Sequence, residues 1–132
     1  MNRKTVLFAA AIFVLCIPGL LWAGDMKLKK AVICLDIKDK EPVGEGKEFD
    51  AASVKKIYCH TEIEGASATD QITHVWYFGG KKVHEFSVPV KAAKWRTWTG
   101  KNIFAGQTGA WKVDVMDTTG KKVLGSAEFR VK

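Results

Sequence analysis

Hydrophobic and polar residues alternate along most of the chain after about residue 30, and turn-forming residues interrupt the alternation roughly every ten positions. A repeat of two residues is that of a β-strand, because successive side chains point to opposite faces. We therefore expect an all-β protein. The pattern predicts seven strands, over residues 31–37, 54–63, 72–78, 81–90, 95–99, 110–116 and 122–131.

Two of the connections predict tight hairpins. Gly79-Gly80 separates two of the strands, and Asp117-Thr118-Thr119-Gly120 separates the last two. Glycine suits such turns because their tight forms require a positive φ. Seven short antiparallel strands with this spacing predict an immunoglobulin-like antiparallel β-sandwich, with a small barrel as the alternative.

The strand over residues 54–63 is expected to have two different faces. Its apolar face is expected to be buried and its polar face to be in contact with water. The first carries Ile57, Cys59, Thr61 and Ile63, and the second carries Tyr58, His60 and Glu62.

The start of the chain departs from the strand pattern. Residues 2–4 are polar or basic and precede an apolar run over residues 5–23 that has no charged residue and contains Pro18-Gly19. This order is typical of a signal peptide, here residues 1–23, followed by a β domain over residues 24–132. The alternative is an uncleaved inner-membrane anchor formed by residues 5–23.

The chain has three cysteines, of which Cys16 lies in the leader. Cys34 and Cys59 remain, and an even number of cysteines in an exported protein predicts a disulfide. Their bond would close a loop of roughly 25 residues and contribute about 3 kcal/mol of stability in the chain-entropy description. It requires neighbouring strands. Two buried free thiols are the alternative.

Short motifs follow one another in an order that is itself informative. They are Cys34, Glu41-Pro42-Val43-Gly44, Ile57-Tyr58-Cys59, His74-Val75-Trp76-Tyr77, Trp95-Arg96-Thr97-Trp98, Gly109-Ala110-Trp111-Lys112-Val113 and Phe129-Arg130-Val131. In this order the chain resembles, over nearly all of residues 30–132, the bacterial domain-of-unknown-function family 2914. Thr99-Gly100-Lys101 departs from the family pattern, in which serines are expected. The resemblance implies a compact secreted or membrane-tethered β domain and carries over no catalytic residue.

Three histidines, His60, His74 and His84, all fall on predicted strands. Together with Met116 or a carboxylate, three imidazoles suit copper or zinc. Alternation places His84 beside Phe86 and places His60 on the polar face of its own strand, so convergence on one ion requires a particular strand order. A periplasmic metal-binding protein is therefore the alternative function, and structural histidines are the simpler interpretation.

Aromatic and basic residues gather around the strand at residues 95–99. Alternation directs Trp95 to one face and Arg96 and Trp98 to the other, so one indole is expected at the surface. An exposed indole beside a guanidinium can stack on a sugar ring or anchor a protein interface, although Arg96 packed over an indole is the structural alternative. The predicted partner surface consists of Trp95, Arg96, Trp98, Trp76 and Tyr77, with Lys91, Lys94 and Lys101 around it.

Other features limit the range of functions. The lysines form scattered doublets, which protect strand edges and, together with export, argue against nucleic acid as a partner. The sequence contains no nucleophile elbow, phosphate loop or zinc-protease motif, and no carboxylate pair stands out. We expect a periplasmic or secreted module that is not an enzyme, needs no cofactor, and binds an envelope protein or glycan. Only an uncleaved leader would place it in a membrane.

Overall fold

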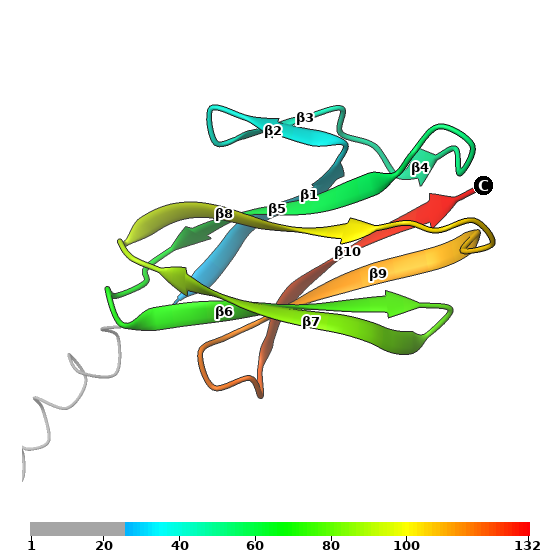
Figure 1. Cartoon of the computed structure of the whole chain (residues 1–132). Coiled ribbons are helices and arrows are strands. Elements are labelled where there is room, and N and C mark those ends of the chain that lie inside the picture. Colours follow the sequence, from blue (N-terminus) through cyan, green and yellow to red (C-terminus); the bar gives the residue numbers. More distant parts are fainter. Residues whose placement is uncertain (1–25) are drawn as a thin grey trace, which may run out of the picture.

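Ten strands form two facing sheets and one separate hairpin in the computed structural model, which describes residues 26–132 (Figure 1). The predicted signal peptide at residues 1–23 and the alternative anchor at residues 5–23 lie outside the described residues. Within the described part, no helix has the length and hydropathy that a membrane crossing requires.

The smaller sheet has three strands and the larger sheet has five. The smaller follows the order β1 (Lys27–Cys34), β5 (Lys56–Glu64) and β8 (Lys94–Asn102). The larger follows the order β4 (Glu48–Phe49), β10 (Val123–Val131), β9 (Gly109–Met116), β6 (Asp70–Phe78) and β7 (Lys81–Val90). The hairpin joins β2 (Asp36–Lys38) to β3 (Glu41–Val43). All pairs are antiparallel except β4 with β10.

The seven longer strands correspond to those that the alternation predicts, and the all-β prediction is confirmed. The predicted strand over residues 31–37 was wrong at its end, because β1 stops at Cys34 and β2 begins at Asp36. The chain turns away at Leu35, whose N–H donates to the carbonyl of Val43 at 3.0 Å. The β2, β3 and β4 strands are only two or three residues long, too short for a period of two to be visible.

Glycines at positive φ form the predicted hairpin turns. Gly79 and Gly80 have φ of 60° and 82°, as the primed turn between β6 and β7 requires, and Gly120 has φ of 73°. The β2–β3 turn uses the same geometry without glycine, since Asp39 and Lys40 have φ of 51° and 65°. Left-handed conformation is uncommon for such residues and costs roughly 1 kcal/mol each, so contacts must hold this turn in place.

The interior of the sandwich is filled by the apolar faces of both sheets. The alternation of β5 places Ile57, Cys59 and Ile63 in this core, as predicted, and Thr61 is buried with them. Across the core, Trp76 of β6 is fully buried against the ring of Phe129 at 6.3 Å between centroids. The predicted wet face of β5 was wrong at His60, which is fully buried beneath the β2–β3 hairpin.

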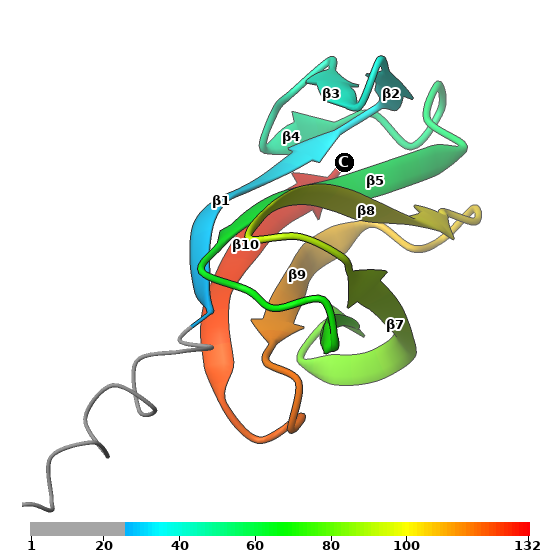
Figure 2. The same cartoon turned by 90° about the vertical axis from the view of Figure 1, so that its left-hand side faces the viewer.

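Along its two long sides the sandwich is not closed by strand pairing. On one side β1 lies beside β10 (Figure 2). There a Cβ at Gly125 would lie 2.5 Å from Cδ2 of Leu28. On the other side the end strands β7 and β8 belong to different sheets and are likewise not paired with each other.

Candidate ligand-binding groove

A groove of about 460 Å³ lies on the β7–β8 side of the sandwich. We call it the β7–β8 groove. It is lined by Val88 and Pro89 of β7, Lys91 in the connection, Lys94, Trp95, Arg96, Thr97 and Trp98 of β8, and Lys40 of the β2–β3 turn. Its size falls within the usual range for small-ligand sites, about 300–1,000 Å³.

The groove brings together Trp95, Arg96 and Trp98, the three residues that the sequence placed at the centre of a partner surface. Alternation places Trp95 on one face of β8 and Arg96 and Trp98 on the other. However, β8 is the end strand of its sheet. Side chains from both faces of an end strand can border the same groove. Both indoles are half-buried, in place of the predicted single exposed one.

Trp98 is held in position by a buried histidine. The imidazole of His60 lies parallel to the indole, with 5° between the planes and 6.0 Å between the centroids. The Nε2–H of His60 donates to the carbonyl of Lys40 at 2.8 Å, and Nδ1 has no partner among the described residues. This bond also restrains the strained β2–β3 turn, so hairpin, imidazole and indole support one another.

Arg96 is tied to the same hairpin. Its guanidinium forms an ion pair with the carboxylate of Glu41 on β3, and both side chains are substantially exposed. A solvent-exposed pair of this kind contributes little to stability, about 0–1 kcal/mol. The ion pair places the side chain of Arg96 at the hairpin. The structural alternative from the sequence, in which Arg96 packs over an indole, placed it elsewhere.

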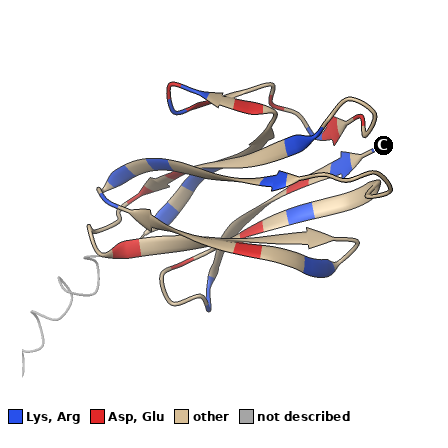
Figure 3. Cartoon of the chain, viewed as in Figure 1, with Lys and Arg blue, Asp and Glu red and all other residues tan. Residues whose placement is uncertain are grey.

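All charged residues that line the groove are basic. Four of the nine lining residues are basic and none is acidic. Among the described residues, Lys40, Lys91 and Lys94 have no carboxylate within ion-pair distance, whereas Arg96 has Glu41. Figure 3 shows the basic segments that β8 carries toward its ends. The groove therefore has uncompensated positive charge beside two aromatic rings.

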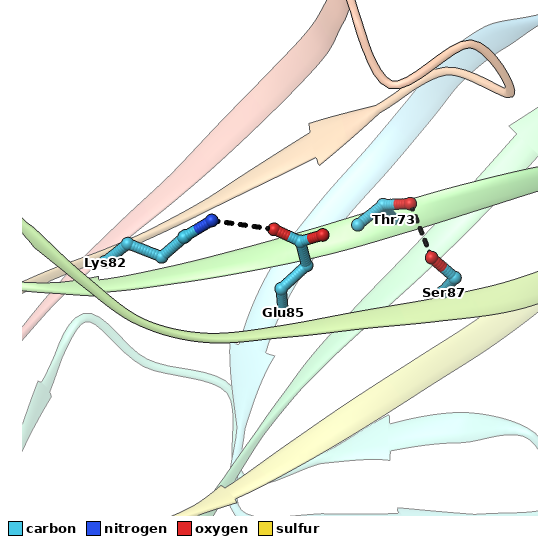
Figure 4. Close-up of polar contacts among 4 residues, drawn as sticks. All are labelled: Thr73, Lys82, Glu85 and Ser87. Atoms are coloured by element: carbon cyan, nitrogen blue, oxygen red, sulfur yellow. Dashed lines mark hydrogen bonds and ion pairs between the residues drawn. The ribbon is translucent and has the colours of Figure 1, made fainter.

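Other hollows and faces have mixed or satisfied charge. A hollow of about 580 Å³ lies over β9 and β10 and is lined by acidic Glu48 and Glu128 as well as by basic residues. On β6 and β7 the polar side chains pair with each other, Thr73 with Ser87 at 2.8 Å and Lys82 with Glu85 at 3.1 Å (Figure 4).

Two residues of the predicted partner surface lie elsewhere. Trp76 has no exposed surface, so its indole cannot contact a partner in this structure; it belongs to the core. Tyr77 is half-buried and lines the hollow over β9 and β10, where the ammonium of Lys112 lies 4.9 Å from its ring centroid. Both corrections have one cause: β6 lies in the larger sheet, away from the outer face of β8.

His74 is part of a polar network in the core. Its Nδ1 lies 2.7 Å from Oγ1 of Thr99, which also accepts a hydrogen bond from Nε1–H of Trp76 at 3.1 Å. Its Nε2 lies 3.4 Å from Oγ1 of Thr61, whose hydroxyl donates to the carbonyl of Thr97 at 2.9 Å.

These partners assign the protons of His74. The hydroxyl of Thr61 already donates its proton to the carbonyl of Thr97. Toward His74 it can therefore only accept a hydrogen bond, from Nε2–H. Thr99 then donates its proton to His74 Nδ1. Each hydroxyl and ring nitrogen is satisfied when His74 is neutral. Burial, with a smaller contribution from the charge of His60, lowers the pKa of His74 from 6.5 to about 4.

The three histidines do not meet at one point. His74 lies in the core, His60 lies beneath the hairpin, and exposed His84 packs on the ring of Phe86 at 4.1 Å between centroids. Among residues 26–132, no group of three His, Cys, Asp or Glu side chains is arranged to hold a metal ion. The arrangement gives the alternative histidine site no common centre.

Cys34 and Cys59 are free, buried thiols in this structure, so the predicted disulfide is not formed in it. Their strands are neighbours, as the bond requires, but the register pairs Cys34 with Tyr58 and Cys59 with Ile33. Alternation therefore directs the two thiols to opposite faces of the sheet. Burial raises the pKa of both thiols.

We expect residues 24–132, purified without reductant, to react with a thiol reagent only after denaturation, with two equivalents per chain. The buried, protonated thiols of the native protein are poor nucleophiles. A denatured sample that gave no reactive thiol would show that the disulfide forms after all.

Sequence reasoning missed the part of the groove that the hairpin supplies. Lys40 reaches the groove from a turn of Asp39 and Lys40, which lacks the glycine or asparagine by which such turns are recognised. The burial of His60 depends on the same turn. Val88 and Pro89 line the groove because the end of β7 lies opposite β8, a neighbourhood that the strand pattern does not reveal.

Comparisons with known proteins give a family match for part of the chain and a fold for most of it. Residues 69–131 match the model of DUF2914, a family described as protein of unknown function. The match spans β6 to β10 and so includes Pro89, Lys91 and the β8 part of the groove. No curated protein matches the sequence.

Two solved structures share the architecture. An immunoglobulin-like protein from Pseudomonas aeruginosa is similar with a TM-score of 0.59 and 13% identity, covering 83% of this chain and 98% of that one. The Pseudomonas fluorescens alkylpurine DNA glycosylase AlkC, bound to DNA containing an abasic site analog, is similar with a TM-score of 0.52 and 12% identity. That match covers 86% of this chain and 33% of the glycosylase. At these identities the likeness shows the fold alone, and it confirms the immunoglobulin-like sandwich.

Proposed function

We propose that this chain, whose residues 69–131 are a DUF2914 domain, is an exported, non-catalytic binding module of the bacterial envelope. The β7–β8 groove is its contact surface, and its ligand is acidic. The observation that carries the proposal is the combination of two half-buried indoles with three lysines that lack a carboxylate partner among the described residues.

The restraints on the groove support a binding role. Indoles and arginine are the side chains that most often dominate binding energy at interfaces. Here the indole of Trp98 is packed against His60, so ordering this side chain costs little when a ligand binds. The buried polar groups of the core, by contrast, are satisfied by one another in the His74 network.

Export is the second part of the proposal. Residues 1–23 act as a signal peptide that is removed, and the domain then works in the periplasm or outside the cell. The mass of the protein recovered from its own cells tests this: we expect a chain that starts near Gly24. A full-length chain retained in the membrane fraction would replace the proposal with the anchor formed by residues 5–23.

Crosslinking in intact cells tests the groove. We expect the double variant Lys91→Gln and Lys94→Gln to lower the yield of crosslinked envelope partner about tenfold, because each lysine supplies a charge that no internal acid neutralises.

The double variant Lys121→Gln and Lys122→Gln is the matched control, since it removes the same charge from the β9–β10 connection. If both double variants lowered the yield equally, net charge rather than the groove would determine binding. If neither lowered it, Lys91 and Lys94 would make no contribution. Either result would contradict the proposal.

A further inference from the structure

We infer that the β7–β8 groove binds an acidic polysaccharide, with one sugar ring stacked on Trp98 and acidic groups of the chain on Lys40, Lys91 and Lys94. This inference rests on the proposed function and names the class of its ligand. It follows from three observations: where the lysines lie, how the indole of Trp98 lines the groove, and which residues form the edges of β7 and β8.

The positions of the lysines in the groove suit an extended ligand with several negative groups. Lys40 reaches the groove from the hairpin, Lys91 from the β7–β8 connection and Lys94 from the start of β8. Three point charges on flexible stems, supplied by different segments, suit acidic groups that repeat along a chain. The forked guanidinium of Arg96, which would favour a single carboxylate held by two hydrogen bonds, is already bound to Glu41.

The indole of Trp98 indicates which kind of chemical group the ligand places against the groove. Trp98 is half-buried, lines the groove and is backed by the parallel ring of His60. A rigid aromatic ring of this kind binds a flat partner with an apolar face. A pyranose ring has such a face of C–H groups, and in an acidic polysaccharide the negative groups lie on or next to the same ring.

The strand edges argue against an acidic peptide. A peptide that joins a sheet pairs with the free N–H and C=O groups of an end strand. Pro89, which lines the β7 side of the groove, has no N–H to offer. On the β8 side, Lys94 and Arg96 are charged edge residues of the kind that discourages pairing. The groove thus combines sites for charge and for a ring with edges that are poor for adding a strand.

Four probes separate the possible ligands in isothermal titrations of residues 24–132. They are oligogalacturonate, which has acid and ring; neutral dextran, which has only the ring; poly-L-glutamate, which has only the acid; and a DNA duplex. We expect oligogalacturonate to bind at least tenfold more tightly than each of the other three.

Trp98→Leu is the decisive variant. It keeps an apolar cover over His60 but removes the flat ring, and we expect about tenfold weaker binding of oligogalacturonate. Phe104→Ala is the matched control, because Phe104 is 61% exposed and does not line the groove, and its affinity is expected to stay unchanged. Circular dichroism identifies a variant that has lost its fold, and Lys91→Gln with Lys94→Gln then supplies the second measurement, again with about tenfold weaker binding.

The outcomes keep this inference apart from the proposed function. If poly-L-glutamate or DNA binds as tightly as oligogalacturonate and depends on Lys91 and Lys94, the groove is a binding site but not one for a polysaccharide. If Trp98→Leu binds oligogalacturonate as the unchanged protein does, the stacking is wrong. If no probe depends on the groove, and crosslinking in cells does not either, both proposals fall.

Discussion

Replacing Trp76 with alanine is expected to remove a large part of the stability of the domain. Trp76 has no exposed surface, packs edge-on against Phe129 and donates its Nε1–H to Thr99. Truncating a buried tryptophan costs about 3–5 kcal/mol in lost burial and in the cavity that remains. Since domains of this size are stable by only about 5–15 kcal/mol, the midpoint of urea unfolding should fall steeply.

Two further variants provide comparisons for this effect. Trp76→Phe keeps a ring in the core but loses the hydrogen bond to Thr99 and part of the buried volume, so it should cost less than alanine. Phe104→Ala removes an aromatic side chain that is 61% exposed and should change stability by no more than about 0.5 kcal/mol. If Trp76→Ala were as mild as Phe104→Ala, Trp76 would not be a core residue, and its prediction as a surface residue would regain support.

The sequence predicted the strands well because alternation is a local signal that the fold reinforces. In β5 the residues Ile57, Cys59 and Ile63 face the core as their spacing requires. The glycines at 79 and 80 mark their hairpin because few other residues reach positive φ. The short β2–β3 hairpin carries neither signal, so it could be seen only in three dimensions.

The candidate site was partly predictable for the same reason. Trp95, Arg96 and Trp98 lie on one strand, and their closeness follows from the sequence alone. Whether Trp76 lies beside them depends on which sheet β6 joins, and alternation within a strand does not contain that information. The burial of His60 depends on a hairpin that folds back over β5, and the partners of His74 come from two strands that are distant in sequence.

Acidification is expected to destabilise the domain through His74. Its pKa is about 4 in the folded protein and 6.5 in the unfolded chain. Above about pH 6.5 both states hold a neutral imidazole, and His74 adds no pH dependence. As the pH falls from 6.5 toward 4, only the unfolded chain takes up the proton, so the folded state loses stability. A shift of this size corresponds to about 3 kcal/mol when complete.

The loss has a structural cause that a variant can isolate. A protonated His74 would need two acceptors, but Thr99 presents its hydroxyl proton to Nδ1 while it accepts from Trp76. Urea midpoints measured between about pH 7.5 and pH 4.5 should fall for the unchanged protein and for His84→Gln, whose histidine is exposed. For His74→Gln the fall should be much smaller. The carboxylates Asp70, Asp117 and Glu48 have lowered pKa values and contribute mainly below this range. If His74→Gln kept the full pH dependence, or the His74 ring titrated near 6.5 by NMR in the folded protein, the buried neutral histidine would be wrong.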